Sequence, residues 1–148
     1  MYRHILAATD GSDSANKAVH HAAALAKATG ARLTIVNVTQ MWSSLDVANA
    51  AEAGVKNPIG EYEAMAARSA EKVLAAAKAL AATDGTACET LHVQDRAPAE
   101  GIIAAAKDKG CDLIVMATHG RRGLGRLLLG SQAVEVLTTS KVPVLVVR

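Results

Sequence analysis

The sequence predicts an α/β domain in which helices cover both faces of a parallel sheet. Along its 148 residues, five short β-rich runs alternate with four longer segments of helical periodicity. Strict alternation of this kind produces parallel strands joined by right-handed crossovers, which place helices on both faces of the sheet. No repeat or linker interrupts the pattern, and 51% of the residues are apolar. We therefore expect residues 1–148 to form a single domain that buries roughly 70% of its unfolded surface.

Turn residues and apolar periodicity set the expected element boundaries. The strands are expected at residues 3–9, 33–38, 86–93, 112–117 and 142–147, and the helices at residues 15–29, 61–82, 98–110 and 131–139. Residues 40–60 are less regular, and such a segment in a compact domain is usually functional, mobile or partly helical. Within it, residues 45–53 could form a short helix.

The ends of the predicted elements carry residues that suit them. Short polar side chains at residues 10–14 can accept hydrogen bonds from free N–H groups at the start of the first helix. Gly30 suits the left-handed conformation that follows many helices, and Pro98 suits a helix start, where its missing N–H costs little. Residues 86–93 place polar and apolar side chains on both sides, which favours an edge strand. Residues 112–117 are expected to form the most buried strand.

Charge and composition exclude several classes of partner. With 16 basic and 14 acidic residues, and only one Trp, two Tyr and no Phe, we expect no nucleic-acid partner. No apolar run reaches the roughly 20 residues of a membrane span, and the N-terminus shows no signal-peptide pattern, so a cytoplasmic location is expected. Cys88 and Cys111 lie outside any CxxC pair and are expected to be small buried thiols. The histidines form no metal-ligand set, so no metal site is predicted.

The segment with the clearest chemistry is the glycine-rich stretch from residue 117 to residue 131. It lies at the carboxyl end of an expected buried strand and leads into the last helix. Open α/β sheets bind ligands at the carboxyl ends of their strands. Glycines let the backbone approach a phosphate, and a helix start supplies free N–H donors with a favourable dipole. Ser131 could add a hydroxyl donor. Arg121, Arg122 and Arg126 could screen phosphate charge, or form no more than a solvated rim.

Two familiar phosphate-binding motifs do not match this stretch. Gly125 to Ser131 reads GxxxxGS and lacks the lysine of a Walker A loop. Gly123-Leu124-Gly125 begins like a dinucleotide fingerprint, but the last glycine of that motif is missing and the segment follows the fourth strand instead of the first. The stretch therefore represents another kind of loop.

That loop resembles the nucleotide loop of the universal stress protein family. Its ATP-binding members carry G-x-x-G, nine residues and then G-[ST]. Here Ala117 to Gly120 is followed by nine residues, from Arg121 to Leu129, and then by Gly130-Ser131. The resemblance covers the whole chain, including Thr9-Asp10-Gly11-Ser12, Val36-Asn37-Val38 and the terminal Val-Pro-Val-Leu-Val-Val. The chain is identified as a member of the ATP-binding type in which Ala117 replaces the first motif glycine.

The resemblance implies a fold and a nucleotide site. The implied sheet is open, five-stranded and Rossmann-like, in the order 3-2-1-4-5, and its switch point lies between strands 1 and 4. Asp10 would meet the ribose and the backbone of Val38 the adenine of ATP, ADP or AMP, with Mg²⁺ accompanying ATP. The phosphates would lie along the glycine-rich loop. The implied nucleotide-binding residues are Ala8, Thr9, Asp10, Val38, Met116, Ala117, His119, Gly120, Arg121, Arg122, Gly123, Gly130, Ser131, Gln132 and Ala133.

The resemblance also implies a homodimer formed through residues 142–147. This strand is apolar on both faces, yet it is expected at an edge of the sheet, and an exposed apolar edge invites pairing. In the family, the fifth strands commonly pair antiparallel across a two-fold axis. Pro143 removes one N–H donor near the start of the strand and leaves the others available.

Several alternatives stay open. Ala117 adds a methyl group where the backbone could approach a ligand. The chain could therefore bind no nucleotide and act as a dimeric protein-interaction module. Asp10 could instead cap the first helix or its turn, and His119 is either a phosphate neighbour or bonded to the loop backbone. The leading hypothesis is a cytoplasmic stress-response or regulatory protein that binds an adenine nucleotide. Without a Walker lysine or a positioned base, any hydrolysis is expected to be slow.

Overall fold

The computed structural model describes residues 1–119 and 129–148, and it confirms the predicted sheet. The strands are β1 (His4–Ala8), β2 (Arg32–Val38), β3 (Glu89–Val93), β4 (Leu113–Ala117) and β5 (Val144–Val147). They pair in parallel in the order β3-β2-β1-β4-β5. β3 is thus an edge strand, as the mixed polarity of residues 86–93 predicts, and β5 forms the other edge.

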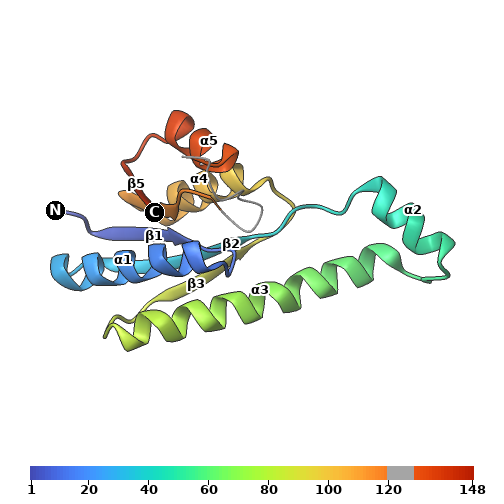
Figure 1. Cartoon of the computed structure of the whole chain (residues 1–148), viewed down its shortest axis with the longest axis horizontal. Coiled ribbons are helices and arrows are strands. Elements are labelled where there is room, and N and C mark those ends of the chain that lie inside the picture. Colours follow the sequence, from blue (N-terminus) through green and yellow to red (C-terminus); the bar gives the residue numbers. More distant parts are fainter. Residues whose placement is uncertain (120–128) are drawn as a thin grey trace.

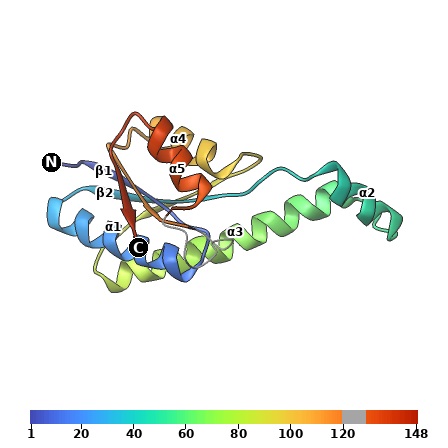
Figure 2. The same ribbon diagram turned by 45° about the horizontal axis from the view of Figure 1, so that its top comes forward.

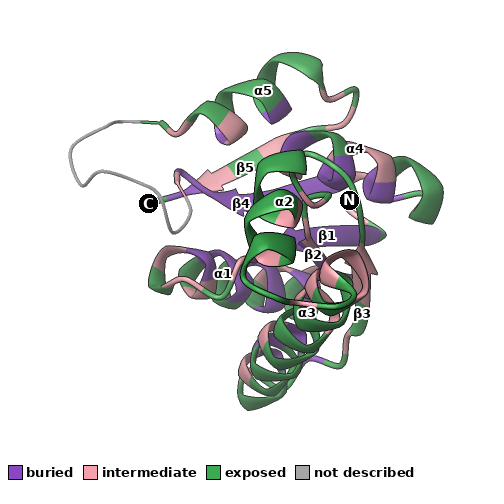
Figure 3. Ribbon diagram, turned by 90° about the vertical axis from the view of Figure 1, so that its right-hand side faces the viewer, coloured by how far each residue is buried: buried purple, intermediate pink, exposed green. Residues whose placement is uncertain are grey.

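Helices cover both faces of this sheet, as expected from the alternation. They are α1 (Asp13–Thr29), α2 (Ser44–Glu52), α3 (Pro58–Thr83), α4 (Pro98–Lys109) and α5 (Ser131–Thr139). α1 and α3 pack on one face and α4 and α5 on the other (Figures 1 and 3). Because side chains alternate along a strand, Ile5 and Ala7 join the core beneath α1, while Leu6 and Ala8 join the core beneath α4. From Ile5 to Ala8, β1 is apolar because both of its faces are covered.

The segment between β2 and the long helix is more helical than the prediction. α2 lies close to the short helix expected at residues 45–53, whereas α3 begins at Pro58 instead of residue 61. The earlier start has a local cause, since Oδ1 of Asn57 accepts a hydrogen bond from the N–H of Gly60 and Pro58 fits the first turn. No residue of α2 is buried, and the buried residues of α3 begin at Ala70. α2 and the first half of α3 accordingly project beyond the sheet (Figures 1 and 2).

The two edge strands begin later than predicted by more than one residue, because polar contacts hold the preceding residues in other conformations. β3 begins at Glu89 instead of Thr86, whose hydroxyl donates to the carbonyl of Ala23 in α1. β5 begins at Val144 instead of Val142, whose N–H donates to Oγ of Ser140 in the turn after α5. No helix within residues 1–119 or 129–148 is long and apolar enough to cross a bilayer.

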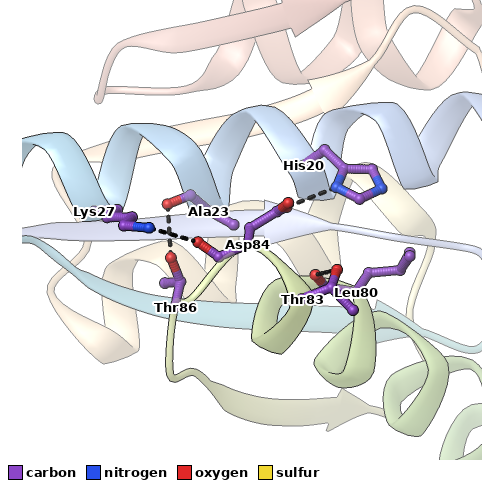
Figure 4. A network of polar contacts seen from close by, with 7 residues as sticks. All are labelled: His20, Ala23, Lys27, Leu80, Thr83, Asp84 and Thr86. Carbon is purple, nitrogen blue, oxygen red and sulfur yellow. Dashed lines mark hydrogen bonds and ion pairs between the residues drawn. The ribbon is translucent and has the colours of Figure 1, made fainter.

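A polar network fastens the end of α3 to α1 (Figure 4). Nδ1 of His20 lies 2.6 Å from Oδ2 of Asp84, and Nζ of Lys27 donates to the carbonyl of Asp84 at 3.2 Å. The buried hydroxyl of Thr86 donates to the carbonyl of Ala23 at 2.9 Å. The turn between α3 and β3 is thereby held against α1.

The two cysteines differ in burial, so the expectation of two buried thiols is only half correct. Cys111 is buried beneath α4, and burial raises its thiol pKa to about 11. Cys88 is only half-buried because it lies at the sheet edge, packed against the core on the α3 face. Burial raises its pKa as well.

His4 is a buried polar residue at the start of β1, and its imidazole sits in a network of its own. Nε2 lies 2.8 Å from Oγ1 of Thr34, and Nδ1 lies 3.1 Å from the carbonyl oxygen of Lys109. Burial lowers the pKa of this imidazole, and the nearby Arg32 guanidinium lowers it further. His4 is therefore neutral in the folded protein at neutral pH.

The lowered pKa of His4 makes folding stability depend on pH. The unfolded chain takes up a proton near the ordinary pKa of 6.5, before the folded chain does, so acidification favours the unfolded state. We expect the free energy of unfolding to fall between about pH 7 and about pH 5, and His4→Gln to flatten this dependence. Urea unfolding across this range measures it, with the exposed His21→Gln as the control. An unchanged pH dependence in His4→Gln would contradict this assignment.

Candidate functional site

The turn after β1 is held by side-chain hydrogen bonds to its own backbone. Oγ1 of Thr9 accepts from the N–H of Gly11 at 3.1 Å, and Oδ1 of Asp10 accepts from the N–H of Ser12 at 2.9 Å. Gly11 has a φ of 81°, which favours glycine. Ser12 is the residue that caps α1, since its Oγ accepts from the N–H of Ala15 at 3.2 Å. Asp10 therefore shapes the turn, and it lies half-buried at the carboxyl end of β1.

The end of β2 directs backbone groups toward this turn. The carbonyl of Val36 accepts from the N–H of Thr9 at 2.9 Å, so the peptide groups of Val36 face β1. Two residues further along a strand the peptide groups face the same way, and those of Val38 therefore point past the end of β1. The Thr9 carbonyl, which a longer ladder would offer to the N–H of Val38, accepts from Nδ2 of Asn37 at 2.9 Å instead. The Asn37 side chain thus ends the ladder, and the Val38 backbone groups are left pointing past the end of β1.

The side chain of Val38 packs against the first turn of α4, on the face of the sheet that α4 and α5 cover. A Cβ atom added at Gly101 would lie 2.6 Å from Cγ1 and 2.7 Å from Cγ2 of Val38. Only a glycine at this position lets α4 approach the end of β2 so closely.

The third part of the site lies where β4 ends and α5 begins. The N–H of Gly130 donates to the carbonyl of Thr118 at 2.6 Å, which joins the two ends of the glycine-rich loop. Gly130 is the N-cap of α5 and has no side chain that could occupy the free N–H groups of the first turn. Nδ1 of His119 lies 3.0 Å from Oγ1 of Thr118, so this imidazole is bonded to a neighbouring hydroxyl. Gly120, Arg121, Arg122 and Gly123, which the sequence also predicts, lie outside the described residues.

Several predicted residues are turned into the core. Ala117 is 7% exposed, is paired with Val147 in the sheet and belongs to the core beneath α1. Its methyl group is therefore packed within the protein. Ala8, Met116 and Ala133 belong to the core on the other face, so any contact from these residues to a ligand would involve their backbone.

Gln132 has a structural partner that the sequence did not reveal. Its Oε1 accepts from the N–H of Ala99 at 2.9 Å. The N-cap of α4 is Ala97, which has no polar side chain. Gln132 of α5 therefore supplies the acceptor that an N-cap side chain would otherwise provide. The two helices on this face are thus joined at their N-termini, both of which face the carboxyl edge of the sheet.

The described part of the site contains the Asp10 carboxylate, the N-terminus of a helix and an imidazole. The N-terminus of α5 carries the positive end of the helix dipole, equivalent to about half an elementary charge. At the other side, Nε2 of His92 lies 2.7 Å from Oγ1 of Thr39. Burial lowers the pKa of His92, although Asp95 raises it slightly, so this imidazole is neutral at neutral pH. Among the described residues, no group of three or more His, Cys, Asp or Glu side chains is arranged to hold a metal ion.

Comparison with known proteins assigns the chain to a family. The profile of the universal stress protein family matches residues 1–148. The chain belongs to the universal stress protein family. It is 40% identical over 153 aligned residues to the Thermus aquaticus universal stress protein in the QAH/OAS sulfhydrylase 3′ region, and 35% identical over 152 to Bacillus subtilis YxiE. In both cases the alignment covers 100% of each chain.

Solved structures agree with this assignment. The protein MJ0577 of Methanocaldococcus jannaschii superposes with a TM-score of 0.80 at 28% identity, covering 99% of this chain and 96% of that one. A universal stress protein in complex with cAMP superposes with a TM-score of 0.72 at 27% identity, covering 99% and 97% of the two chains. The strand order implied by the resemblance is therefore confirmed.

Asn37 is the site residue that sequence reasoning did not single out. A buried amide near the end of an otherwise apolar strand is the signal that could have found it. We expect Asn37→Ala to lower the free energy of unfolding by about 1–3 kcal/mol, because the Thr9 carbonyl loses its partner. Urea denaturation measures this, with the exposed Asn49→Ala in α2 as the control. Equal stability of Asn37→Ala and the parent protein would contradict this role.

Proposed function

We propose that this universal stress protein binds ATP, or a related adenine nucleotide, in the crevice between the ends of β1 and β4. The observation that carries the proposal is the bond from the Gly130 N–H to the Thr118 carbonyl. It holds the N-terminus of α5 at the end of β4, and β4 is paired with β1, the strand that leads into the turn at Asp10. Open α/β sheets bind ligands at such a switch point, and helix N-termini bind phosphates.

Base and ribose would be held on the β1–β2 side of the crevice. The Val38 backbone offers one donor and one acceptor, which suits the edge of an adenine ring. The Asp10 carboxylate could accept a hydrogen bond from a ribose hydroxyl. It also accepts one from the Ser12 N–H, which helps to fix its orientation.

The phosphates would be held on the β4–α5 side. The N–H groups of Ser131, Gln132 and Ala133 belong to the first turn of α5, where they have no partner within the helix. The Ser131 hydroxyl adds a further donor, and Mg²⁺ would arrive with ATP, bound by its phosphates. Because the loop lacks a Walker lysine, we expect regulation by nucleotide occupancy, with slow hydrolysis at most.

Two observations favour this function over a family member that binds no nucleotide. The Ala117 methyl group, which could have blocked a phosphate, packs in the core beneath α1. In addition, a structural neighbour at 27% identity is a universal stress protein in complex with cAMP, an adenine nucleotide. A stress-response role in the cytoplasm is part of the proposal, and family membership supports it.

We also propose that the protein forms a homodimer through β5. The carbonyls of Pro143 and Val147 accept from Ile114 and Thr118, so the odd-numbered residues of this segment face β4. Val144 and Val146 therefore present their peptide groups outward along the free edge, ready to pair with a second copy. Leu145 is 38% exposed and would add apolar contact. The same edge could serve a protein-interaction module if no nucleotide is bound.

Nucleotide binding is tested by calorimetric titration of nucleotide-stripped protein with ATP and Mg²⁺. We expect an affinity in the micromolar range and its loss in Gly130→Val. A Cβ at residue 130 would already lie 3.2 Å from the Thr118 carbonyl oxygen and 3.3 Å from Cβ of His119, and valine adds two further methyl groups. Circular dichroism checks that the variant folds. Ala117→Gly should keep the affinity within about twofold, because its methyl group is in the core.

No binding of ATP, ADP or AMP by the folded parent protein would overturn the nucleotide proposal and favour the dimeric interaction module. A gain of affinity in Ala117→Gly would show that the methyl group obstructs the ligand, contrary to its position in the core.

The dimer is tested by sedimentation equilibrium of Val146→Pro. Proline removes an outward N–H from the free edge in both copies, so we expect dimerisation to weaken by about tenfold or more without loss of the fold. Leu145→Pro is the matched comparison, since its N–H faces β4 and its loss should destabilise the monomer itself. A monomeric parent protein would contradict the dimer.

A further inference from the structure

The first turn of α4 lies between the two proposed halves of the nucleotide site. At one side, Gly101 is buried against the Val38 side chain, so closely that any Cβ there would meet both Cγ atoms. The Val38 side chain is β-branched and stiff, so it has little freedom to turn away. The position of α4 thereby determines the position of the Val38 backbone, which would bind the base.

At its other side, the same turn is bonded to α5. The Ala99 N–H donates to Oε1 of Gln132 at 2.9 Å. Gln132 is the second residue of α5, and its own N–H belongs to the group of donors proposed to bind phosphate. The position of α4 therefore also constrains the N-terminus of α5.

We propose that the first turn of α4, residues 98–101, sets the spacing between the base-binding and phosphate-binding halves of the site, with Gly101 and Gln132 as its positioning residues. This inference rests on the proposed nucleotide site. It assigns to α4 a part in ligand selection although neither Gly101 nor the Gln132 side chain needs to touch the ligand. A nucleotide fits when the distance from its base to its phosphates matches this spacing.

Glycine inside a helix supports this reading. Alanine is the better helix former, so a glycine within the first turns of α4 lowers the intrinsic stability of the helix. The structure accounts for it by the close approach to Val38. The hydrogen bond from the Ala99 N–H to Gln132 links α4 to α5, because Gln132 lies on α5. A Ser or Asp cap within the α4 segment would make no such link.

The test measures binding of the base-containing and the phosphate-containing part of the ligand separately. Displacement of a fluorescent ATP analogue by adenosine and by inorganic tripolyphosphate is measured for the parent protein, Gly101→Ala and Gln132→Met. We expect Gly101→Ala to weaken adenosine by about tenfold, as for one lost hydrogen bond, and tripolyphosphate by less than about twofold. Gln132→Met, which keeps the length of the side chain and removes its acceptor, should do the reverse. Both should weaken ATP.

A compensating variant keeps the test decisive if Gly101→Ala is poorly folded. Val38→Ala removes the two Cγ atoms that a Cβ at residue 101 would meet, so the double variant Val38→Ala/Gly101→Ala should recover adenosine affinity. Ala104→Gly in the same helix controls for a general loss of helix stability and should change neither ligand selectively.

The outcomes distinguish this inference from the function on which it rests. If the parent protein binds neither ATP nor its two fragments, the nucleotide site itself is wrong and the spacing role falls with it. If the parent protein binds all three but the two variants lower both fragments equally, or neither, the nucleotide site stands and the positioning role of α4 is wrong.

Discussion

β1 is hydrogen-bonded on both of its edges, to β2 and to β4, and this double pairing organises the rest of the molecule. The chain first winds outward from β1 through β2 to β3, and it must then cross back over the sheet to place β4 on the other side of β1. β1 leads into α1 on one face of the sheet, whereas α5, which follows β4 along the chain, lies on the other face. Strand order therefore sets a switch point between β1 and β4, before any particular side chain is considered.

Polar residues at the two ends of the sheet have different tasks. At the amino ends of the strands, His4 and Thr34 satisfy each other within the core. At the carboxyl ends, Nδ2 of Asn37 donates to the Thr9 carbonyl, and the β1–β2 ladder of backbone hydrogen bonds ends there. Hydrogen bonds satisfy the polar groups at the amino end, whereas at the carboxyl end the Val38 peptide groups point past the end of β1 and the N-terminus of α5 lies at the end of β4. That asymmetry supports placing the proposed nucleotide at the carboxyl end.

Sequence reasoning predicted what depends on local pattern and missed what depends on contacts between distant residues. Alternating apolar runs predicted all of the described strands, and Gly130-Ser131 predicted the start of α5. The early start of α3 depends on capping by Asn57, and the sequence pattern did not predict this cap. Gly101 and Gln132 became meaningful only when the fold brought Val38 and Ala99 against them. No periodicity in the sequence encodes such pairs.

The proposed function requires a ligand that extends from Val38 to the N-terminus of α5. The most direct measurement is a titration of ¹⁵N-labelled protein with ATP and Mg²⁺, followed by amide chemical shifts. We predict that the amides of Asp10, Val38 and Ser131 shift together, while those of His4 and Gly110, at the opposite end of the sheet, stay in place. Shifts confined to the opposite end, or none at Val38 and Ser131, would contradict it.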